Sequence, residues 1–178
     1  MKLSAKILTL LGWQIGDVCL PKKCVIVLAP HTSNWDFVYG ILYRSALGIQ
    51  THFTIKNDWF RFPFRRMMER LGGIPIDRTT HNGLVEQAVS NFRASDSYYI
   101  VITPEGTRRP NSEWHTGCVR IAAQAEVPIA MAYIDYKNKT LGVNHQLHTP
   151  SGNIAADIMT IKNAYSAEQA RYPEKFRI

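Results

Sequence analysis

Short apolar runs alternate with segments of helical periodicity along this chain. The apolar runs predict strands, and they cover residues 24–29, 52–56, 73–78, 98–103, 127–134 and 140–143. Apolar residues at helical spacing predict helices over residues 3–17, 34–46, 61–71, 82–93, 117–125 and 154–165. Strands that alternate with amphipathic helices predict an α/β fold, in which a mixed, mostly parallel sheet is flanked by layers of helices. Because no repeat or long linker divides the chain, residues 1–178 are predicted to form a single domain.

The N-terminal segment, residues 1–20, is predicted to be an amphipathic helix that lies at an interface. A helix over residues 3–17 places four apolar side chains on one face, namely Leu3, Ile7, Leu10 and Leu11. The segment resembles a signal peptide, but Gln14 and Asp17 interrupt its apolar part and no small-residue cleavage pattern follows. We therefore expect a retained helix, and no stretch of the chain reaches the roughly 18 apolar residues of a membrane-spanning helix.

Composition and charge narrow the choice of partners. With 46% hydrophobic and 20% charged residues, the chain has the composition of a globular protein. Cys19, Cys24 and Cys118 show no paired spacing, which favours a reducing cytoplasm. A net charge of +7 favours acidic partners, among them phospholipid headgroups, the phosphates of coenzyme A, acyl carrier protein and nucleic acid. Charge alone does not choose among these.

A histidine and an aspartate follow the first predicted strand directly. His31 and Asp36 lie five positions apart, so on one continuous helix they would point away from each other. They can meet only if His31 lies in the loop and Asp36 in the first turns of the helix, which Ser33 or Asn34 would cap. Asp36 would then orient the imidazole and leave its other nitrogen free as a general base. A capped loop whose histidine merely packs is the alternative.

Two further polar clusters lie at the ends of later predicted strands. Arg78 ends the run over residues 73–78, and its planar guanidinium suits a phosphorylated ligand. Glu105, Gly106, Thr107 and Arg108 follow the strand over residues 98–103 and combine a glycine, a hydroxyl and a guanidinium. Glu105 fits a substrate hydroxyl, or would hold Arg78 or Arg108. The alternative is an ordinary connection between a strand and a turn.

The order of these segments resembles that of the glycerolipid acyltransferases, the 1-acylglycerol-3-phosphate (lysophospholipid) acyltransferase-like family. The four matching motifs are His31-x4-Asp36, residues 73–78, residues 104–108 and the apolar-Pro-apolar residues 127–129. They fall within residues 24–135, the predicted motif-bearing core. The resemblance implies that His31 and Asp36 deprotonate an acceptor hydroxyl for attack on an acyl thioester. It also implies acceptor contacts from Arg78, Glu105, Gly106 and Arg108.

Two features depart from the family pattern. Many relatives carry a lysine in an aromatic-Lys-x-Gly segment after the third motif, where this chain has His115 in the segment over residues 114–117. A neutral histidine binds phosphate less well, so the acceptor stays open between a lysophospholipid and another alcohol. The chain also lacks the long N-terminal region that many relatives insert into a membrane.

Aromatic and basic residues alternate over residues 57–66, which include Trp59, Arg61 and Arg65. Such a stretch suits an anionic membrane surface, acyl carrier protein or coenzyme A. Alternatively, Phe62, Phe64, Met67 and Met68 are core residues of one helix. No RNA-binding signature accompanies the stretch, and we expect no nucleic-acid partner. The histidines at 52, 81, 145 and 148 have no partners at metal-ligand spacing, so we expect no metal.

Together, these observations predict a cytoplasmic acyltransferase that is peripherally associated with the inner face of the membrane. It would use acyl-CoA or acyl carrier protein as co-substrate and hold no bound cofactor. A thioesterase that uses the same pair on water, or a non-catalytic lipid- or phosphate-binding protein, are the alternatives.

Overall fold

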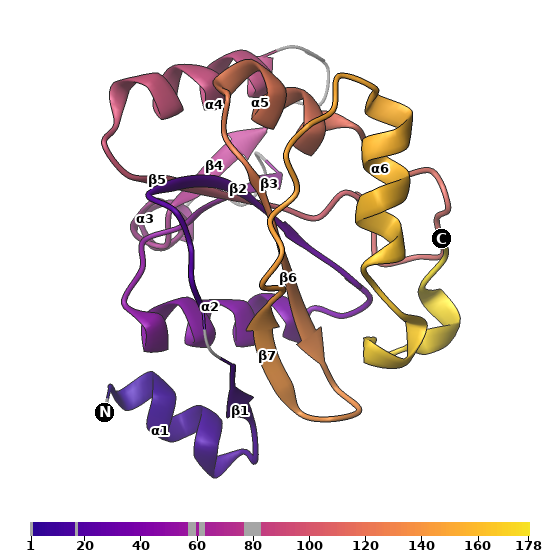
Figure 1. Ribbon diagram of the computed structural model, residues 1–178. Coiled ribbons are helices and arrows are strands. Elements are labelled where there is room, and N and C mark those ends of the chain that lie inside the picture. Colours follow the sequence, from indigo (N-terminus) through magenta and orange to yellow (C-terminus); the bar gives the residue numbers. More distant parts are fainter. Residues whose placement is uncertain (1, 17, 57–59, 61–62, 77–82) are drawn as a thin grey trace.

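The computed structural model describes residues 2–16, 18–56, 60, 63–76 and 83–178 (Figure 1). Within these residues the centre of the molecule is a seven-stranded sheet with the order β1-β7-β6-β2-β5-β3-β4. The strands are β1 (Gln14–Ile15), β2 (Lys23–Leu28), β3 (His52–Lys56), β4 (Gly73–Ile76), β5 (Tyr98–Ile102), β6 (Ile129–Asp135) and β7 (Thr140–Val143). All neighbouring strands run parallel except β6 and β7, which form an antiparallel hairpin. The predicted mixed, mostly parallel sheet is confirmed.

Helices cover both faces of this sheet (Figure 1). They are α1 (Leu3–Leu10), α2 (Trp35–Leu47), α3 (Arg65–Arg70), α4 (Gly83–Ala94), α5 (Gly117–Ala125) and α6 (Ile154–Asn163). Alternate residues of β2 point to opposite faces, as the period of a strand requires. Val25 and Val27 pack with α4, α5 and α6, whereas Cys24 and Ile26 face the layer that contains α2.

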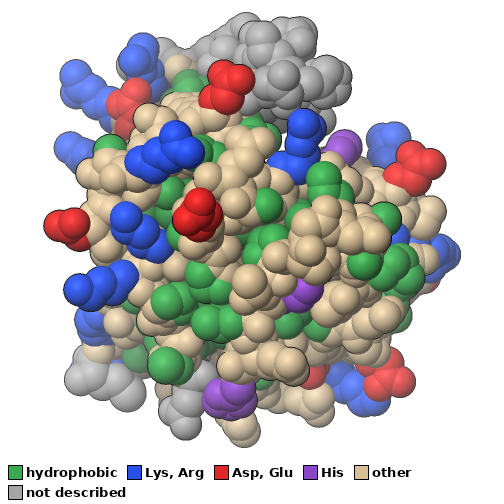
Figure 2. All heavy atoms as spheres, turned by 45° about the horizontal axis from the view of Figure 1, so that its top comes forward, with side chains coloured by type: hydrophobic (Ala, Val, Ile, Leu, Met, Phe, Trp, Pro, Cys, Tyr) green, Lys and Arg blue, Asp and Glu red, His purple; other side chains and the backbone are tan. Residues whose placement is uncertain are grey.

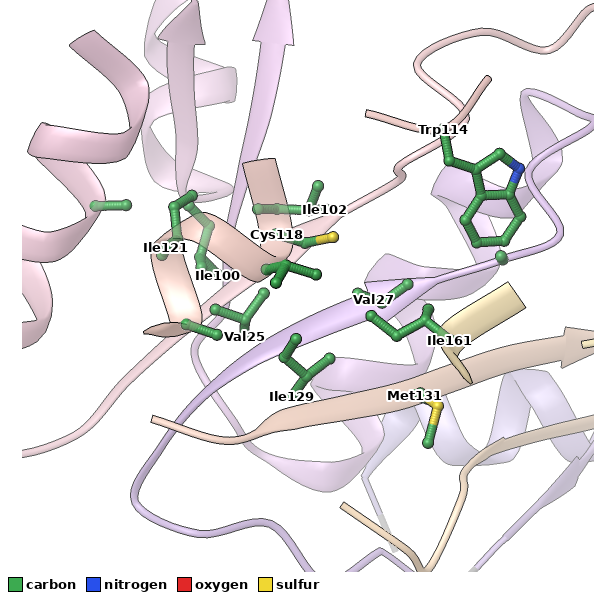
Figure 3. Close-up of a cluster of buried hydrophobic side chains, with 14 of the residues drawn as sticks. Val25, Val27, Ile100, Ile102, Trp114, Cys118, Ile121, Ile129, Met131 and Ile161 are labelled. Atoms are coloured by element: carbon green, nitrogen blue, oxygen red, sulfur yellow. The ribbon is translucent and has the colours of Figure 1, made fainter. Parts of the chain in front are cut away.

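The larger core lies between the sheet and the α4–α5–α6 layer (Figure 3). The strands contribute alternate aliphatic side chains, such as Val25, Ile100 and Ile129, and α5 contributes Cys118 and Ile121. These residues are at most 1% exposed. Continuous apolar runs such as that of β2 are explained by this arrangement, because a central parallel strand is buried on both faces.

The predicted N-terminal helix is wrong beyond Leu10. Gly12 has φ +79°, in the left-handed region that favours glycine, and it ends the helix. Residues 14–15 then form β1, whose amide at Gln14 donates to the carbonyl of Lys139 at 2.8 Å. This edge pairing depends on β7, which is distant in sequence, so helical periodicity near the N-terminus could not reveal it.

The apolar face predicted for α1 points outward. Leu3 and Leu10 are 74% and 88% exposed, while the small residues Ser4 and Ala5 and the fully buried Leu8 face α2. None of the helices in the described part of the chain is long and apolar enough to cross a membrane.

The C-terminal segment contains two short 3-10 helices that the sequence pattern did not predict, η2 (Ala167–Gln169) and η3 (Pro173–Lys175). Ser166 and Gln169 form a capping box that starts η2. Phe176 is buried at 3% exposure, and the Tyr165 hydroxyl donates to the carbonyl of Val27 at 2.9 Å. The segment is thereby fastened to the sheet beside the end of β2.

Candidate functional site

The loops that follow β2 and β5 lie side by side at the carboxyl edge of the sheet. The two strands are parallel neighbours, with Val27 in register with Ile102. One hydrogen bond joins the loops directly, because the backbone N–H of His31 donates to Oε1 of Glu105 at 2.8 Å. Two polar clusters separated by 74 residues in the sequence therefore form one site, at the edge where α/β sheets bind ligands.

The His31 and Asp36 side chains meet in the predicted way. His31 lies in the loop and Asp36 is the second residue of α2, and Nδ1 of His31 lies 3.1 Å from Oδ2 of Asp36. Ser33 contributes to the helix start, since its Oγ accepts a hydrogen bond from the Trp35 amide at 3.2 Å. Asn34 is the N-cap residue but makes no capping hydrogen bond with its side chain. This geometry confirms the spatial part of the prediction.

Asp36 is fully buried and hydrogen-bonded through both carboxylate oxygens. Oδ2 accepts from the amides of Thr32 at 3.0 Å and Ser33 at 2.9 Å, in addition to the imidazole. Oδ1 accepts from the hydroxyl of Tyr136 at 2.6 Å. Sequence reasoning missed Tyr136, which lies 100 residues from Asp36 and follows β6 directly. No local signal marks it.

The second ring nitrogen of His31, Nε2, is not used in the contact with Asp36. A carboxylate at Nδ1 favours the tautomer with the proton on Nδ1, so that Nε2 carries a lone pair. Within the residues that the structure describes, Nε2 has no hydrogen-bond partner, and the side chain is 17% exposed. The arrangement can therefore accept a proton from a hydroxyl placed against this edge.

Glu105 holds the loop that carries His31. It is 3% exposed, and burial raises the pKa of its carboxyl to about 7, although the hydrogen bond from the His31 amide opposes the rise. The nearby Asp36 carboxylate adds to the rise. The sequence suggested that Glu105 would meet a substrate hydroxyl or hold Arg78 or Arg108; Arg78 lies outside the described residues, and the hydrogen bond seen is with the His31 backbone. Arg108 donates instead to Oδ1 of Asn34.

Gly106 allows a close approach, although the approaching group is a side chain. Its φ is +64°, and a Cβ at this position would come within 2.5 Å of the His115 ring. His115, predicted to replace a lysine of the family pattern, therefore lies directly beside this segment. Its amide also donates to the carbonyl of Pro104 at 2.7 Å. Thr107 accepts a hydrogen bond from the Arg109 amide at 3.2 Å.

The basic and aromatic stretch is only partly covered by the structure. Trp59, Arg61, Phe62 and Arg78 lie outside the described residues. Arg65 is exposed on α3 and pairs with Glu69 at 2.8 Å. In the same helix region Met68 is buried, whereas Phe64 and Met67 are 47% and 46% exposed. For Met68 the core alternative is confirmed, and for the other two it is wrong.

The C-terminal segment adds an arginine beside the histidine loop. The Arg171 guanidinium lies 5.5 Å from the ring centroid of Trp35 and 5.8 Å from those of Tyr136 and Tyr172. The Tyr172 amide donates to Oγ1 of the buried Thr32 at 3.3 Å. Sequence reasoning missed this arginine as well, because it approaches only through the path of residues 165–172.

An apolar cavity of about 100 Å³ extends along α2 between the helix and the sheet. Its lining runs from Asp36 to Leu47 on the helix and includes Ile26, Leu28 and Ala132 from the sheet. Gly40 faces it without a side chain, and a Cβ there would meet nothing within 4 Å. At Arg44, burial lowers the pKa of the guanidinium, which donates to the carbonyl of Thr51 at 2.7 Å. The cavity therefore begins beside the aspartate and ends near Arg44.

On the face that carries α4 and α5, Lys and Arg side chains are mixed with acidic ones (Figure 2). The described residues contain no group of three His, Cys, Asp or Glu side chains that could hold a metal ion. His148 pairs with a carboxylate nine residues away, since its Nε2 lies 3.0 Å from Oδ1 of Asp157.

Comparison with known proteins places these features in context. A model of the acyltransferase family matches residues 15–135, which include the His31 loop and the Glu105 segment. Among solved structures, the chain is similar to the crystal structure of the 1-acyl-sn-glycerophosphate (LPA) acyltransferase, PlsC, from Thermotoga maritima. The TM-score is 0.61 at 16% sequence identity, and the similarity covers 90% of this chain and 74% of that chain. At this identity the likeness concerns the fold. A search of curated protein sequences finds no match.

Proposed function

This chain belongs to the acyltransferase family, and we propose that it transfers a fatty acyl group from a thioester to a hydroxyl of a lysophospholipid or similar glycerol-phosphate-like acceptor. The observation that carries the proposal is the His31–Asp36 pair, whose Nε2 edge is open while Nδ1 is held by a buried carboxylate. A base oriented in this way serves hydroxyl activation. Acyl-CoA or acyl carrier protein would be the donor, and the protein would need no bound cofactor.

In the proposed reaction, Nε2 of His31 takes the proton of the acceptor hydroxyl as the oxygen attacks the thioester carbonyl. Asp36 stabilises the imidazolium that forms. Collapse of the tetrahedral intermediate breaks the C–S bond, and the leaving thiolate takes the proton from the imidazolium. The amides of Thr32 and Ser33 already donate to Asp36, so donors to the oxyanion must come from elsewhere.

We assign the acceptor side to the segment after β5. Gly106, Thr107 and Arg108 lie in one turn, and Arg108 is linked to Asn34 at the start of α2. Arg108 is exposed and has no carboxylate partner in the described part of the chain, which leaves its charge available to a phosphate. His115 borders the same turn, and Arg78 joins the site only through the family resemblance. Glu105 supports this side by holding the His31 backbone.

The cavity along α2 is our candidate site for the acyl chain. Its walls are mostly aliphatic, and its lining reaches Asp36, the buried member of the pair. An acyl chain that lay along α2 would bring its thioester carbonyl toward the dyad. Such a narrow apolar site is suited to a hydrocarbon and excludes a polar headgroup.

We also propose that α1 meets the inner face of the membrane. Lys2 and Lys6 accompany the exposed apolar side chains Leu3, Leu10 and Leu11. Apolar side chains flanked by lysines suit the boundary between acyl chains and anionic headgroups. Phe64, the N-cap residue of α3, and Met67 within α3 are also exposed apolar side chains, near Arg65.

The test is acyl transfer from labelled acyl-CoA and acyl carrier protein to a panel of lyso-lipids and other alcohols, scored by mass spectrometry. His31→Ala is expected to lower turnover by about 10²–10⁴-fold while the fold is kept. His145→Ala, which changes an exposed histidine, is the matched control and should behave as the wild type. Near-normal transfer by the His31 variant contradicts the mechanism. Release of free fatty acid whichever acceptor is added identifies the thioesterase alternative.

A further inference from the structure

Tyr136 is the partner of Oδ1 of Asp36. Three donors converge on Oδ2, namely the imidazole and two backbone amides, whereas in the described part of the chain Oδ1 has only the phenol, at 2.6 Å. His31, Asp36 and Tyr136 therefore form a hydrogen-bonded line of three side chains, with Nε2 of His31 at its open end.

Three kinds of contact fix the Tyr136 side chain in place. Its backbone amide donates to the carbonyl of Gln169 at 2.9 Å. Its ring lies edge-on to Trp13, with centroids 5.3 Å apart, and edge-on to Tyr39, at 5.9 Å. The Arg171 guanidinium covers it at 5.8 Å. Loss of the hydroxyl alone would leave the amide hydrogen bond and the ring contacts in place, because only Arg171 also interacts with the hydroxyl.

The phenol is a permanent donor in this position. Burial and the adjacent Asp36 carboxylate both raise the pKa of Tyr136 and outweigh the opposing effect of the Arg171 guanidinium, so the hydroxyl stays protonated at neutral pH. A protonated phenol donates to the carboxylate and stabilises its negative charge. This lowers the basicity of Asp36 and hence its attraction for a proton on His31.

We propose that Tyr136 is a positioning residue that acts on His31 through Asp36 and keeps the imidazole neutral, and so usable as a base, at working pH. The proposal rests on the proposed role of His31. Without this donor, the Asp36 carboxylate would hold the protonated imidazole more tightly. The acidic limb of the pH–rate profile, where His31 becomes protonated, would then move to higher pH. Other charged or titratable groups around the site include Glu105, Arg108, His115 and Arg171, and in the described part of the chain none of these four is a hydrogen-bond partner of Asp36.

Tyr136 and the chain that holds it lie beyond the part that the family model matches, which ends at residue 135. The Gln169 carbonyl holds the Tyr136 amide, and the Tyr172 amide holds Thr32 in the histidine loop. The C-terminal segment thus secures both Tyr136 and the loop. The residues that would act on His31 through Asp36 therefore lie in this part of the chain.

The test compares Tyr136→Phe with Tyr39→Phe, a matched control that removes a hydroxyl from the neighbouring ring and leaves Asp36 fully hydrogen-bonded. The pH profile of kcat/KM and the NMR titration of the His31 ring are measured for both, with resonances assigned through His31→Ala. For Tyr136→Phe, the midpoint of the His31 titration and the acidic limb of the kcat/KM profile should both move to higher pH, by about half a pH unit to one pH unit. At a pH on that limb, the shift lowers the rate by roughly three- to tenfold.

An unchanged or lowered midpoint for Tyr136→Phe overturns the proposal, as does an equal rise in the control variant. A loss of rate that is the same at every pH, with the acidic limb of the pH profile unchanged, also overturns the proposal. Tyr136 would then be a packing residue. The NMR titration needs no substrate. If acyl transfer itself is not found, the effect on His31 is still measured, and failure of the proposed function is distinguished from failure of this inference.

Discussion

The molecule contains two histidine–aspartate pairs that are nearly identical as pairs and differ in everything around them. His31–Asp36 and His148–Asp157 have N···O distances of 3.1 Å and 3.0 Å, and the histidines are 17% and 15% exposed. In the first pair, Asp36 contacts Nδ1 of His31, and Nε2 stays accessible to a ligand. In the second pair Asp157 takes Nε2 itself, the outer nitrogen that would otherwise reach a ligand.

Their surroundings separate them further. Asp36 lines an apolar cavity and lies beside the strand end that carries Glu105, whereas Asp157 accepts the Ser151 amide at the start of α6. Although burial opposes it, hydrogen bonds from Ser151 and His148 lower the pKa of Asp157. The His148 backbone pairs with Ile129 in both directions at 2.8 Å. The second pair therefore fastens a loop to a helix, and a His–Asp contact alone does not identify a site.

The largest expected effect comes from the same substitution made in both pairs. Asp36→Asn removes the charge that orients His31 and stabilises its imidazolium, so kcat should fall by about 10²–10⁴-fold. Asp157→Asn should leave kcat within about threefold of the wild type and lower the free energy of unfolding by about 1–3 kcal/mol. Steady-state kinetics and urea unfolding measure both. Equal losses of activity in the two variants would mean that the pairs are functionally alike.

A second prediction concerns the cavity, which adjoins only the first pair. Gly40→Leu would place a side chain in the open space along α2, so transfer from long-chain donors should fall by roughly 10-fold or more, while short-chain donors are spared. Replacement of a glycine in the helix interior should also stabilise α2 by up to about 1 kcal/mol. Chain-length profiles and thermal unfolding provide the measurements.

Gly40→Ala is the matched control for the cavity, because it gives the helical gain with a much smaller volume. Chain-length profiles that are unchanged in Gly40→Leu would show that the acyl chain lies elsewhere.

The smallest effect concerns Glu105, the carboxylate that supports the first pair. Burial raises its pKa from 4.5 to about 7, so the folded protein keeps this proton over a range in which the unfolded chain has lost it. The free energy of unfolding should therefore decrease as pH rises from about 4.5 to about 7 and then level off, by at most about 3 kcal/mol from this group.

Glu105→Gln keeps an acceptor for the His31 amide and removes the titration, so its stability should decline less over that interval. Urea unfolding at about pH 5 and about pH 8 measures the difference. Glu113→Gln, at an exposed position, should retain the wild-type dependence. The same decline in Glu105→Gln as in the wild type would exclude Glu105 as its source.

Predictions from the sequence succeeded where the signal was local or strongly periodic. The strands predicted over residues 98–103 and 140–143 and the helix predicted over residues 117–125 agree with the structure to within a residue. The His31–Asp36 contact was predictable because both residues lie within one loop and the first turn of one helix. The resemblance to an acyltransferase family rested on the order of such local segments, and the family match confirms it.

Predictions failed where a distant segment decided the outcome. Residues 14–15 left the predicted helix because β7 offered an edge to pair with, and the apolar face of α1 points outward because Leu8 and small residues contact α2. The sequence left Glu105 open between a substrate hydroxyl and an arginine, and it could not show that the His31 amide would lie 2.8 Å away.

The sequence by itself determined the alternation of strands and helices, the loop-and-helix placement of His31 and Asp36, and the family. Each of these depends on periodicity and on hydrogen bonds between near neighbours, which the order of residues encodes directly. Only the tertiary structure decided that Tyr136 completes the carboxylate, that Glu105 holds the histidine loop and that a cavity runs along α2. Those features arise where the packed sheet brings together residues 74 to 100 positions apart, a proximity that no local pattern specifies.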